Sequence, residues 1–182
     1  MLKLLLVMLL LTTEAHGKQI EQQGVGPTGL PTTHYTSEGY VHDWQSFPTI
    51  SGKILGENKK LTIRAREGQA LVAIFIASWC LPCQKLINNI KELEKKYKTR
   101  HTRFVYIFAH DTEADAVGFS KTYKLTGNNL LADVKLMKRF HQPQLPSIYV
   151  ADRRTWLAWR SLETSKKDLT KLDNFLEYHT AN

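Results

Sequence analysis

The sequence predicts an α/β fold with a central mixed β-sheet flanked by helices on both faces. Residues 70–77 (ALVAIFIA) and 104–108 (FVYIF) are apolar on both sides, which is typical of strands covered by helices on each face. A stretch with helical spacing follows the first run, and a helix-capping pattern follows the second. Residues 145–151 and 156–160 then predict an antiparallel hairpin that completes the same sheet.

The first elements are expected to form another hairpin. We expect the fold to begin near Phe47 and to continue with short strands at 53–55 and 60–63. A turn-forming Gly-Glu-Asn stretch at 56–58 separates these strands, which favours an antiparallel pair.

The run 70–77 leads directly into the motif SWCLPC at 78–83. Cys80 and Cys83 of this motif are the only two cysteines of the chain, so both lie where a buried strand turns into a helix. That helix is predicted through Lys98, because apolar residues recur at helical spacing: Leu86, Ile87, Ile90, Leu93 and Tyr97.

A capping-box pattern from Thr112 to Asp115 follows the strand at 104–108. It predicts a helix to about Lys124, with Gly127 near its C-cap.

The last third of the chain holds four expected elements. A short helix at 133–140 precedes the strand at 145–151, and the strand at 156–160 pairs with it. Ser165 caps a final helix whose apolar residues share one face: Leu169, Leu172, Phe175 and Leu176.

The composition fits one domain with a real hydrophobic core. The chain has 182 residues and is 42% hydrophobic, and two cysteines cannot supply a disulfide scaffold. The net charge of +8 suits anionic membranes or acidic partners. Because no binding motif accompanies this charge, we expect no nucleic-acid partner.

The N-terminus has the layout of a cleaved secretory signal peptide at 1–17. Lys3 precedes an apolar run at 4–11, and small residues stand before a cleavage site near Gly17. An uncleaved anchor is the alternative, although the run is far shorter than the ~20 residues that span a bilayer. We therefore expect a periplasmic or secreted protein, in a compartment where disulfides persist.

After the signal peptide we expect two parts. Residues 18–44 are polar and predict a flexible leader that docks through Tyr40 and Trp44, and residues 45–182 form the folded domain.

The cysteine pair fits thiol–disulfide exchange. A cysteine in the first turn of a helix faces unpaired backbone N–H groups and the positive end of the helix dipole, which favour the thiolate. Cys80 occupies that place, and Cys83 lies one turn later on the same side. Pro82 falls within the first turn, where its missing N–H costs little.

Two other interpretations remain open. A zinc site would need two histidines beside the thiolates, and no histidines form a close pair at metal spacing, so we expect no metal. A permanent disulfide would close a very small loop and add little stability.

The segment FIASWCLPC, between a buried strand and a helix, resembles the thioredoxin superfamily. Leu145-Pro146 before SIYV resembles that superfamily's cis-proline strand start. The predicted signal peptide, the early hairpin and the long interval between Cys80 and Pro146 are most similar to the extracytoplasmic TlpA/ResA-like branch.

The resemblance implies a thioredoxin fold and a role for each motif residue. Cys80 would be the attacking thiol and Cys83 the resolving thiol, while Trp79 would shield the pair, with Leu81 and Pro82 as support. Pro146 would be cis and face the disulfide, and Leu145 would offer backbone groups to an extended substrate. The alternatives are core packing for Trp79 and an ordinary trans peptide bond before Pro146.

One position departs from the family pattern. Cytosolic thioredoxins carry a buried Asp six residues before the first cysteine, and here that position is Ile74. The acceptor of the Cys83 proton would then be water or a distant carboxylate such as Glu67.

We therefore expect an exported thiol–disulfide oxidoreductase whose only redox group is the Cys80–Cys83 pair. The resemblance implies a monomeric reductant of protein substrates, for instance in cytochrome c maturation, recycled by a membrane-bound electron donor. The alternatives are a disulfide-forming oxidase or isomerase and a non-catalytic binding module or metal carrier.

Overall fold

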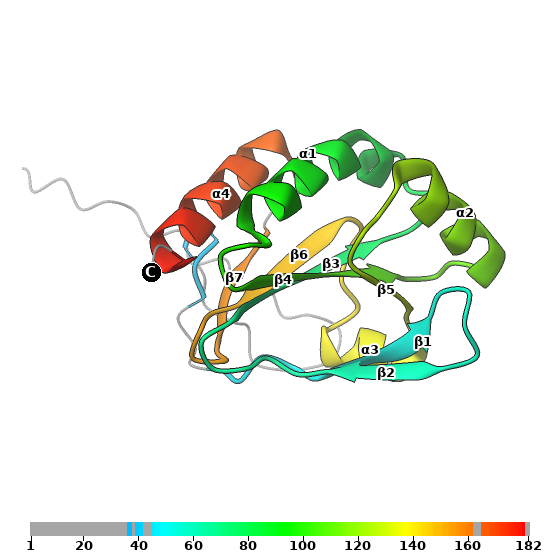
Figure 1. Ribbon diagram of the computed structural model, residues 1–182, viewed down its shortest axis with the longest axis horizontal. Coiled ribbons are helices and arrows are strands. Elements are labelled where there is room, and N and C mark those ends of the chain that lie inside the picture. Colours follow the sequence, from blue (N-terminus) through cyan, green and yellow to red (C-terminus); the bar gives the residue numbers. More distant parts are fainter. Residues whose placement is uncertain (1–35, 38, 42–44, 162–164, 181–182) are drawn as a thin grey trace, which may run out of the picture. The chain divides into compact units, whose positions relative to one another are not determined.

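The computed structural model describes residues 36–37, 39–41, 45–161 and 165–180, all within one compact unit (Figure 1). The predicted signal peptide, most of the leader and Trp44 lie outside the described residues. The elements are β1 (Ile50–Ile54), β2 (Lys60–Ile63), β3 (Ala70–Ile76), α1 (Leu81–Tyr97), β4 (Thr102–Phe108), α2 (Glu113–Tyr123), β5 (Asn128–Leu131), α3 (Val134–Arg139), β6 (Ser147–Ala151), β7 (Leu157–Arg160) and α4 (Lys166–Thr180).

The strands form one mixed sheet in the order β2-β1-β5-β4-β3-β6-β7. The central strands β3, β4 and β5 are parallel, whereas β6 and β7 on one side and β1 and β2 on the other pair antiparallel. All seven residues of β3 are buried, as expected for a strand covered on both faces. The mixed sheet predicted from the sequence is confirmed.

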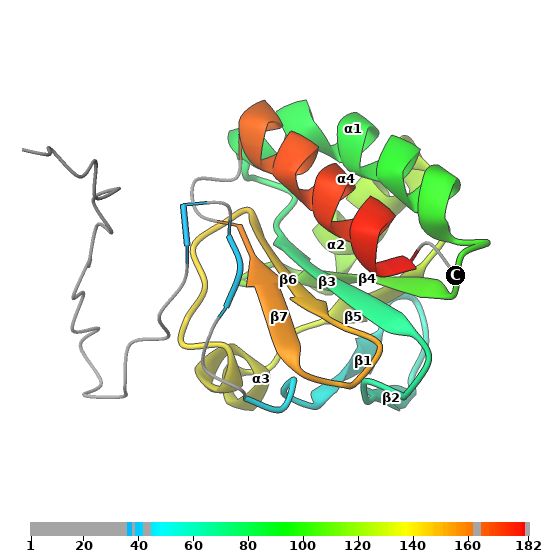
Figure 2. The ribbon, with the colours of Figure 1, turned by 90° about the vertical axis from the view of Figure 1, so that its left-hand side faces the viewer.

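Helices cover both faces of the sheet, also as predicted. Helices α1, α2 and α4 pack on one face, where their apolar residues join those of β3, β4, β6 and β7 in one core cluster (Figures 1 and 2). The short helix α3 packs on the other face, in a second cluster with Phe47, Ile50 and Ile63. Among the described residues, the second face is therefore covered by one helix of six residues, while three helices cover the first.

The structure corrects two details near the end of α2. Strand β5 was not expected, because its sequence NNLL is short and Asn is depleted in strands. It forms because β4 and β1 offer backbone partners on either side. The residue in the left-handed region at the C-cap of α2 is Lys124 (φ 51°), and not Gly127.

The segment before β1 packs against the sheet and α4. Tyr40 bridges to Trp159 of β7, and its ring lies 5.4 Å from that of Phe175. The expected docking through Tyr40 is therefore confirmed.

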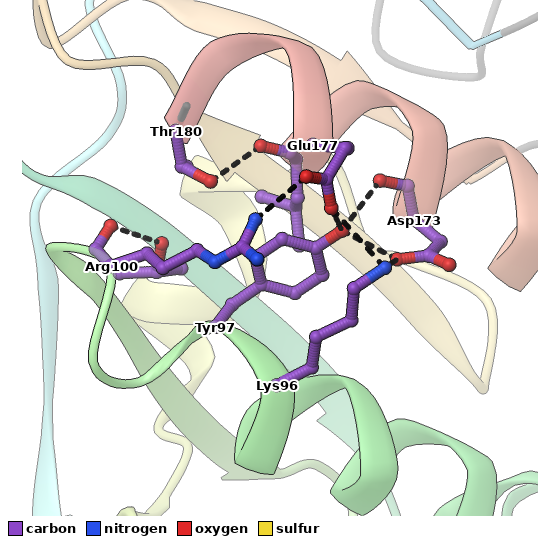
Figure 3. A network of polar contacts seen from close by, with 8 residues as sticks. Lys96, Tyr97, Arg100, Asp173, Glu177 and Thr180 are labelled. Atoms are coloured by element: carbon purple, nitrogen blue, oxygen red, sulfur yellow. Dashed lines mark hydrogen bonds and ion pairs between the residues drawn. The ribbon is translucent and has the colours of Figure 1, made fainter. Parts of the chain in front are cut away.

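A charged network joins the C-terminal end of α1 to α4 (Figure 3). The Tyr97 hydroxyl donates to Asp173 Oδ1 at 2.5 Å and lies 3.0 Å from Glu177 Oε2. Lys96 Nζ lies 2.7 Å from Asp173 Oδ1, and Arg100 Nη1 lies 2.7 Å from Glu177 Oε1. Hydrogen bonds from Arg100, Tyr97 and Lys96 lower the pKa of Glu177 from its ordinary 4.5 to about 2. This network fixes the end of α1 that lies away from the cysteines.

Candidate active site

Helix α1 begins on a cysteine. Cys80 is its N-cap, and the Cys80 Sγ atom accepts a hydrogen bond from the backbone N–H of Cys83 at 3.2 Å. This bond satisfies one of the N–H groups that a helix leaves without an intrahelical partner. Pro82 lies in the first turn, as expected, where no N–H is needed.

Cys80 and Cys83 form a disulfide, with the two Sγ atoms 2.13 Å apart. Cys83 is fully buried and Cys80 is 4% exposed, so only an edge of the Cys80 side chain is open to solvent. Both cysteines belong to the core cluster that contains Ile74 and Ile76 of β3. The pair thus lies in an apolar environment, and Cys80 is the one of the two cysteines that keeps some exposure to solvent.

The residues that flank Cys80 are exposed and apolar. Trp79 is 60% exposed and Leu81 is 66% exposed, so core packing is the wrong interpretation of Trp79. The Trp79 indole Nε1–H donates to the carbonyl oxygen of His110 at 3.0 Å, which fixes the ring beside the loop after β4. Together these two side chains give the buried sulfur an apolar rim.

The Leu145–Pro146 peptide bond is cis, which confirms the sequence-based expectation. Ser147 pairs with Phe75 in the antiparallel β3–β6 ladder, so the register places Pro146 beside Ile76, near the end of β3. Leu145 packs against both core clusters. Strand β6 therefore begins beside the β3 end from which the chain enters the cysteine motif.

Asp111 is a site residue that the sequence analysis missed. Its carboxylate accepts hydrogen bonds from the backbone N–H of Ser78 at 2.6 Å and from the Ser78 hydroxyl at 2.7 Å. The Gln84 side chain donates to the Ser78 carbonyl oxygen at 2.8 Å. The loop that carries the cysteines is thus tied to the end of β4 and to the first turns of α1.

The sequence did hold a signal for Asp111. Parallel strands end at the same edge of a sheet, and binding groups gather at that edge. The cysteine motif follows β3 and Asp111 follows the adjacent parallel strand β4, so the two segments had to meet. The capping pattern from Asp111 to Asp115 predicted only the start of α2, and Thr112 Oγ1 does cap this helix.

The structure also corrects the proposed role of Glu67 as proton acceptor. Glu67 precedes Ala70 at the start of β3, whereas the cysteines follow the end of that strand. Seven strand residues separate the two ends, a span of roughly 23 Å. Glu67 is therefore too far away to accept a proton from Cys83.

The described residues contain no group of three or more His, Cys, Asp and Glu side chains placed to hold a metal ion. Within the same described ranges, no helix is both long enough and apolar enough to cross a membrane.

Comparison with known proteins found similar sequences among thioredoxin-like proteins and thiol-disulfide oxidoreductases. No protein-family model matches the chain. The thioredoxin-like protein YneN of Bacillus subtilis is 26% identical over 134 residues, which cover 71% of this chain and 78% of YneN. The thiol-disulfide oxidoreductase ResA of Bacillus cereus is 26% identical over 98 residues, and the match spans 57% of that protein.

Solved structures share the fold at lower identity. A thioredoxin-family thiol:disulfide interchange protein of Chlorobium tepidum has a TM-score of 0.67 and 19% identity, covering 77% of this chain and 99% of its own. A secreted disulfide oxidoreductase of Mycobacterium tuberculosis has a TM-score of 0.58 and 17% identity, covering 68% and 92%.

The fold, the cysteine pair between β3 and α1, and these relatives define a thioredoxin-fold protein with a redox-type disulfide. The chain has the thioredoxin fold, and its sequence is similar to the thioredoxin-like protein YneN and to ResA thiol-disulfide oxidoreductases.

Proposed function

We propose that this protein reduces disulfides in protein substrates outside the cytosol, using Cys80 and Cys83 as its redox pair. The observation that carries the proposal is the position of Cys80. It is the N-cap of α1, forms a disulfide with Cys83, is 4% exposed and lies between the exposed side chains of Trp79 and Leu81. Such a sulfur is stabilised as a thiolate by the helix start, and the thiolate is the nucleophile.

In the first step, reduced Cys80 attacks one sulfur of a substrate disulfide. A bond forms between Cys80 Sγ and that sulfur, the substrate S–S bond breaks, and the other substrate sulfur leaves as a thiolate. The backbone N–H of Cys83, which reaches Cys80 Sγ at 3.2 Å, stabilises negative charge on the attacking sulfur.

In the second step, Cys83 resolves the mixed disulfide. Its thiol loses a proton to water, its sulfur bonds to Cys80 Sγ, and the substrate leaves with both of its sulfurs reduced. Water is proposed as the acceptor because Ile74 holds the position of the family's buried Asp and Asp111 bonds to Ser78 instead. Two electrons pass from the cysteine pair to the substrate.

The substrate is proposed to bind as an extended segment over the apolar rim. Trp79 and Leu81 offer apolar contacts, and Leu145 with the cis-Pro146 offers backbone groups at the neighbouring strand start. An apolar rim with backbone hydrogen bonds suits many unfolded polypeptides, which fits a substrate such as apocytochrome c before haem attachment.

The rest of the proposal rests on sequence pattern and resemblance. A signal peptide directs export of the protein and is cleaved near Gly17. The mature protein acts as a monomer and needs no cofactor other than the Cys80–Cys83 disulfide. Each turnover leaves the pair oxidised, so a membrane-bound electron donor must reduce it again. Mass spectrometry of the protein from its own cells tests export, since a mature chain that begins at Lys18 is expected.

A trapping experiment tests the exchange chemistry. Cys83→Ser keeps the nucleophile but removes the resolving sulfur, so it should accumulate a mixed disulfide with reduction-sensitive substrates such as insulin. Cys80→Ser is the matched control and should form far less of this adduct, because Cys83 is fully buried. Equal adduct yields from the two variants would contradict the assigned order of attack.

A further inference from the structure

A second candidate site lies beside the β1–β2 hairpin, the start of β4 and the end of α3. Two adjoining surface hollows, of about 570 and about 470 Å³, share Thr62 and Arg64 in their linings. Arg66 and Arg103 complete the basic lining of the first hollow, and Arg139 that of the second. No Asp or Glu lines either hollow.

These arginines come from three separate parts of the chain. Arg64 and Arg66 follow β2, Arg103 lies near the start of β4, and Arg139 ends α3. Arg103 alternates with Phe104 along the strand, so it shares a face with Val105, which packs in the α3-side cluster.

The positive charges of the cluster are not neutralised by the protein itself. Among the described residues, Arg64, Arg66 and Arg103 form no ion pair with a carboxylate, although ion pairs are present elsewhere in the same ranges. Burial, together with the charge of Arg66, lowers the pKa of Arg103 from its ordinary value. The arginine charges repel one another, and an anion that binds between them reduces this repulsion.

Hydroxyl groups stand beside the guanidinium groups. Thr62 lines both hollows, and Thr49 and Ser51 line the second. The Ser51 and Thr62 hydroxyls are hydrogen-bonded to each other at 3.1 Å, which leaves one of the two O–H groups able to donate to an acceptor in the hollow. Guanidinium groups with hydroxyl donors are the combination that binds phosphate oxygens well.

The arginine cluster is separate from the cysteine pair. Arg103 precedes Phe108 by five strand positions, roughly 17 Å, and Phe108 is the residue that pairs with Ile76 at the cysteine end of the sheet. The cysteines also pack on the opposite face, in the cluster beneath α1. A ligand here would leave thiol–disulfide exchange unobstructed.

We propose that Arg64, Arg66, Arg103 and Arg139 form a binding site for a phosphate group, carried by a free phosphate compound or by a phospholipid headgroup. The proposal is independent of the proposed redox function, so either can fail without the other.

Titration of the full-length protein with pyrophosphate at constant ionic strength tests the site. Arginine side-chain NMR signals of the wild type should shift and saturate, while sodium chloride at the same ionic strength should not reproduce the shift. Arg64→Gln with Arg66→Gln removes two exposed donors and should weaken binding by about tenfold or more. Lys95→Gln with Lys98→Gln is the control, because it removes the same charge from exposed positions on the other face and should change affinity by less than about twofold.

Flotation with phosphatidylcholine vesicles, with and without phosphatidylglycerol, identifies the source of the phosphate. Phosphatidylglycerol-dependent binding that is lost only in the Arg64/Arg66 variant indicates a lipid headgroup. Saturable pyrophosphate binding without such a difference indicates a free phosphate compound. No saturable pyrophosphate shift, or equal affinity in the Arg64/Arg66 variant and the wild type, overturns the proposal. An unchanged redox midpoint of Cys80 and Cys83 in both variants shows that they are folded.

Discussion

The two ends of α1 differ in almost every physical respect. The N-terminal end carries a buried sulfur pair with apolar neighbours, and the carboxylate of Asp111 there accepts hydrogen bonds from Ser78. Seventeen residues of helix separate it from the other end, where Tyr97 lies among Asp173, Glu177 and charged Lys96 and Arg100. The comparison indicates that one end is kept chemically available while the other anchors the helix to α4.

The largest expected effect is the loss of disulfide reduction when Cys80 is replaced, compared with a substitution at the other end of α1. Cys80→Ser should reduce insulin disulfides no faster than the buffer does, because the attacking sulfur is gone. Tyr97→Phe, at the other end of the same helix, should keep the rate within about twofold, since Tyr97 touches no reacting atom. The turbidity rate of insulin reduction measures both. A rate for Tyr97→Phe as low as that of Cys80→Ser would show that the two ends do not act separately.

A smaller effect is expected at the loop that holds the cysteine end. Asp111→Ala leaves the N–H and hydroxyl groups of Ser78 without their acceptor, so we expect the exchange rate to fall about tenfold. Asp111→Asn keeps an acceptor but removes a negative charge near the Cys80 thiolate. It should therefore favour the reduced pair and raise its redox midpoint by about 20 mV.

Rate assays and redox titration of both Asp111 variants check this pair of expectations. A wild-type exchange rate in Asp111→Ala, together with a wild-type redox midpoint in Asp111→Asn, would show that Asp111 has no role in the exchange reaction.

At the anchoring end, the loss of one hydroxyl should cost stability and not activity. Tyr97→Phe removes the hydroxyl donor that lies between Asp173 and Glu177, while Lys96 and Arg100 still bind these carboxylates, so we expect the free energy of unfolding to fall by about 1 kcal/mol. Urea denaturation measures the change. Tyr178→Phe is the matched control, because Tyr178 is 79% exposed, and it should be neutral. A stability loss of the same size in both variants would argue against the network.

The smallest effect is a pH dependence at the same network. The pKa of Glu177 is lowered from 4.5 to about 2, so its contribution to stability is present above pH 4.5 and is lost as the pH falls toward 2. Glu177→Gln removes this contribution at neutral pH. The stability difference between wild type and variant should therefore shrink between pH 5 and pH 2 in urea titrations, and a constant difference would contradict the assignment.

The sequence predicted the cysteine end of α1 well because its signals are long and mutually consistent. The run 70–77 is apolar without interruption, and the apolar residues from Leu86 to Tyr97 keep helical spacing for about three turns. Strand β3, the helix after the cysteine motif and the cis-Pro146 followed from these segments or from the family resemblance. Cys80 was expected in the first turn of α1 and is its N-cap.

Features that depend on adjacency in space were not predicted. Strand β5 is formed by pairing with β4 and β1 and not by the propensity of its own four residues. The bonds between Asp111 and Ser78 join residues 33 positions apart. The arginine cluster likewise unites three chain segments, so a count of basic residues gave only the net charge.

The redox midpoint of the Cys80–Cys83 pair tests the central claim most directly. Equilibration of the purified protein with graded thiol–disulfide buffers, followed by thiol alkylation and mass spectrometry, measures it. If the protein is a reductant, we expect a reversible two-electron transition with a midpoint at or below about −250 mV, in the range of thioredoxin. A midpoint near about −120 mV would make the protein an oxidant, and no reversible transition would contradict the exchange function itself.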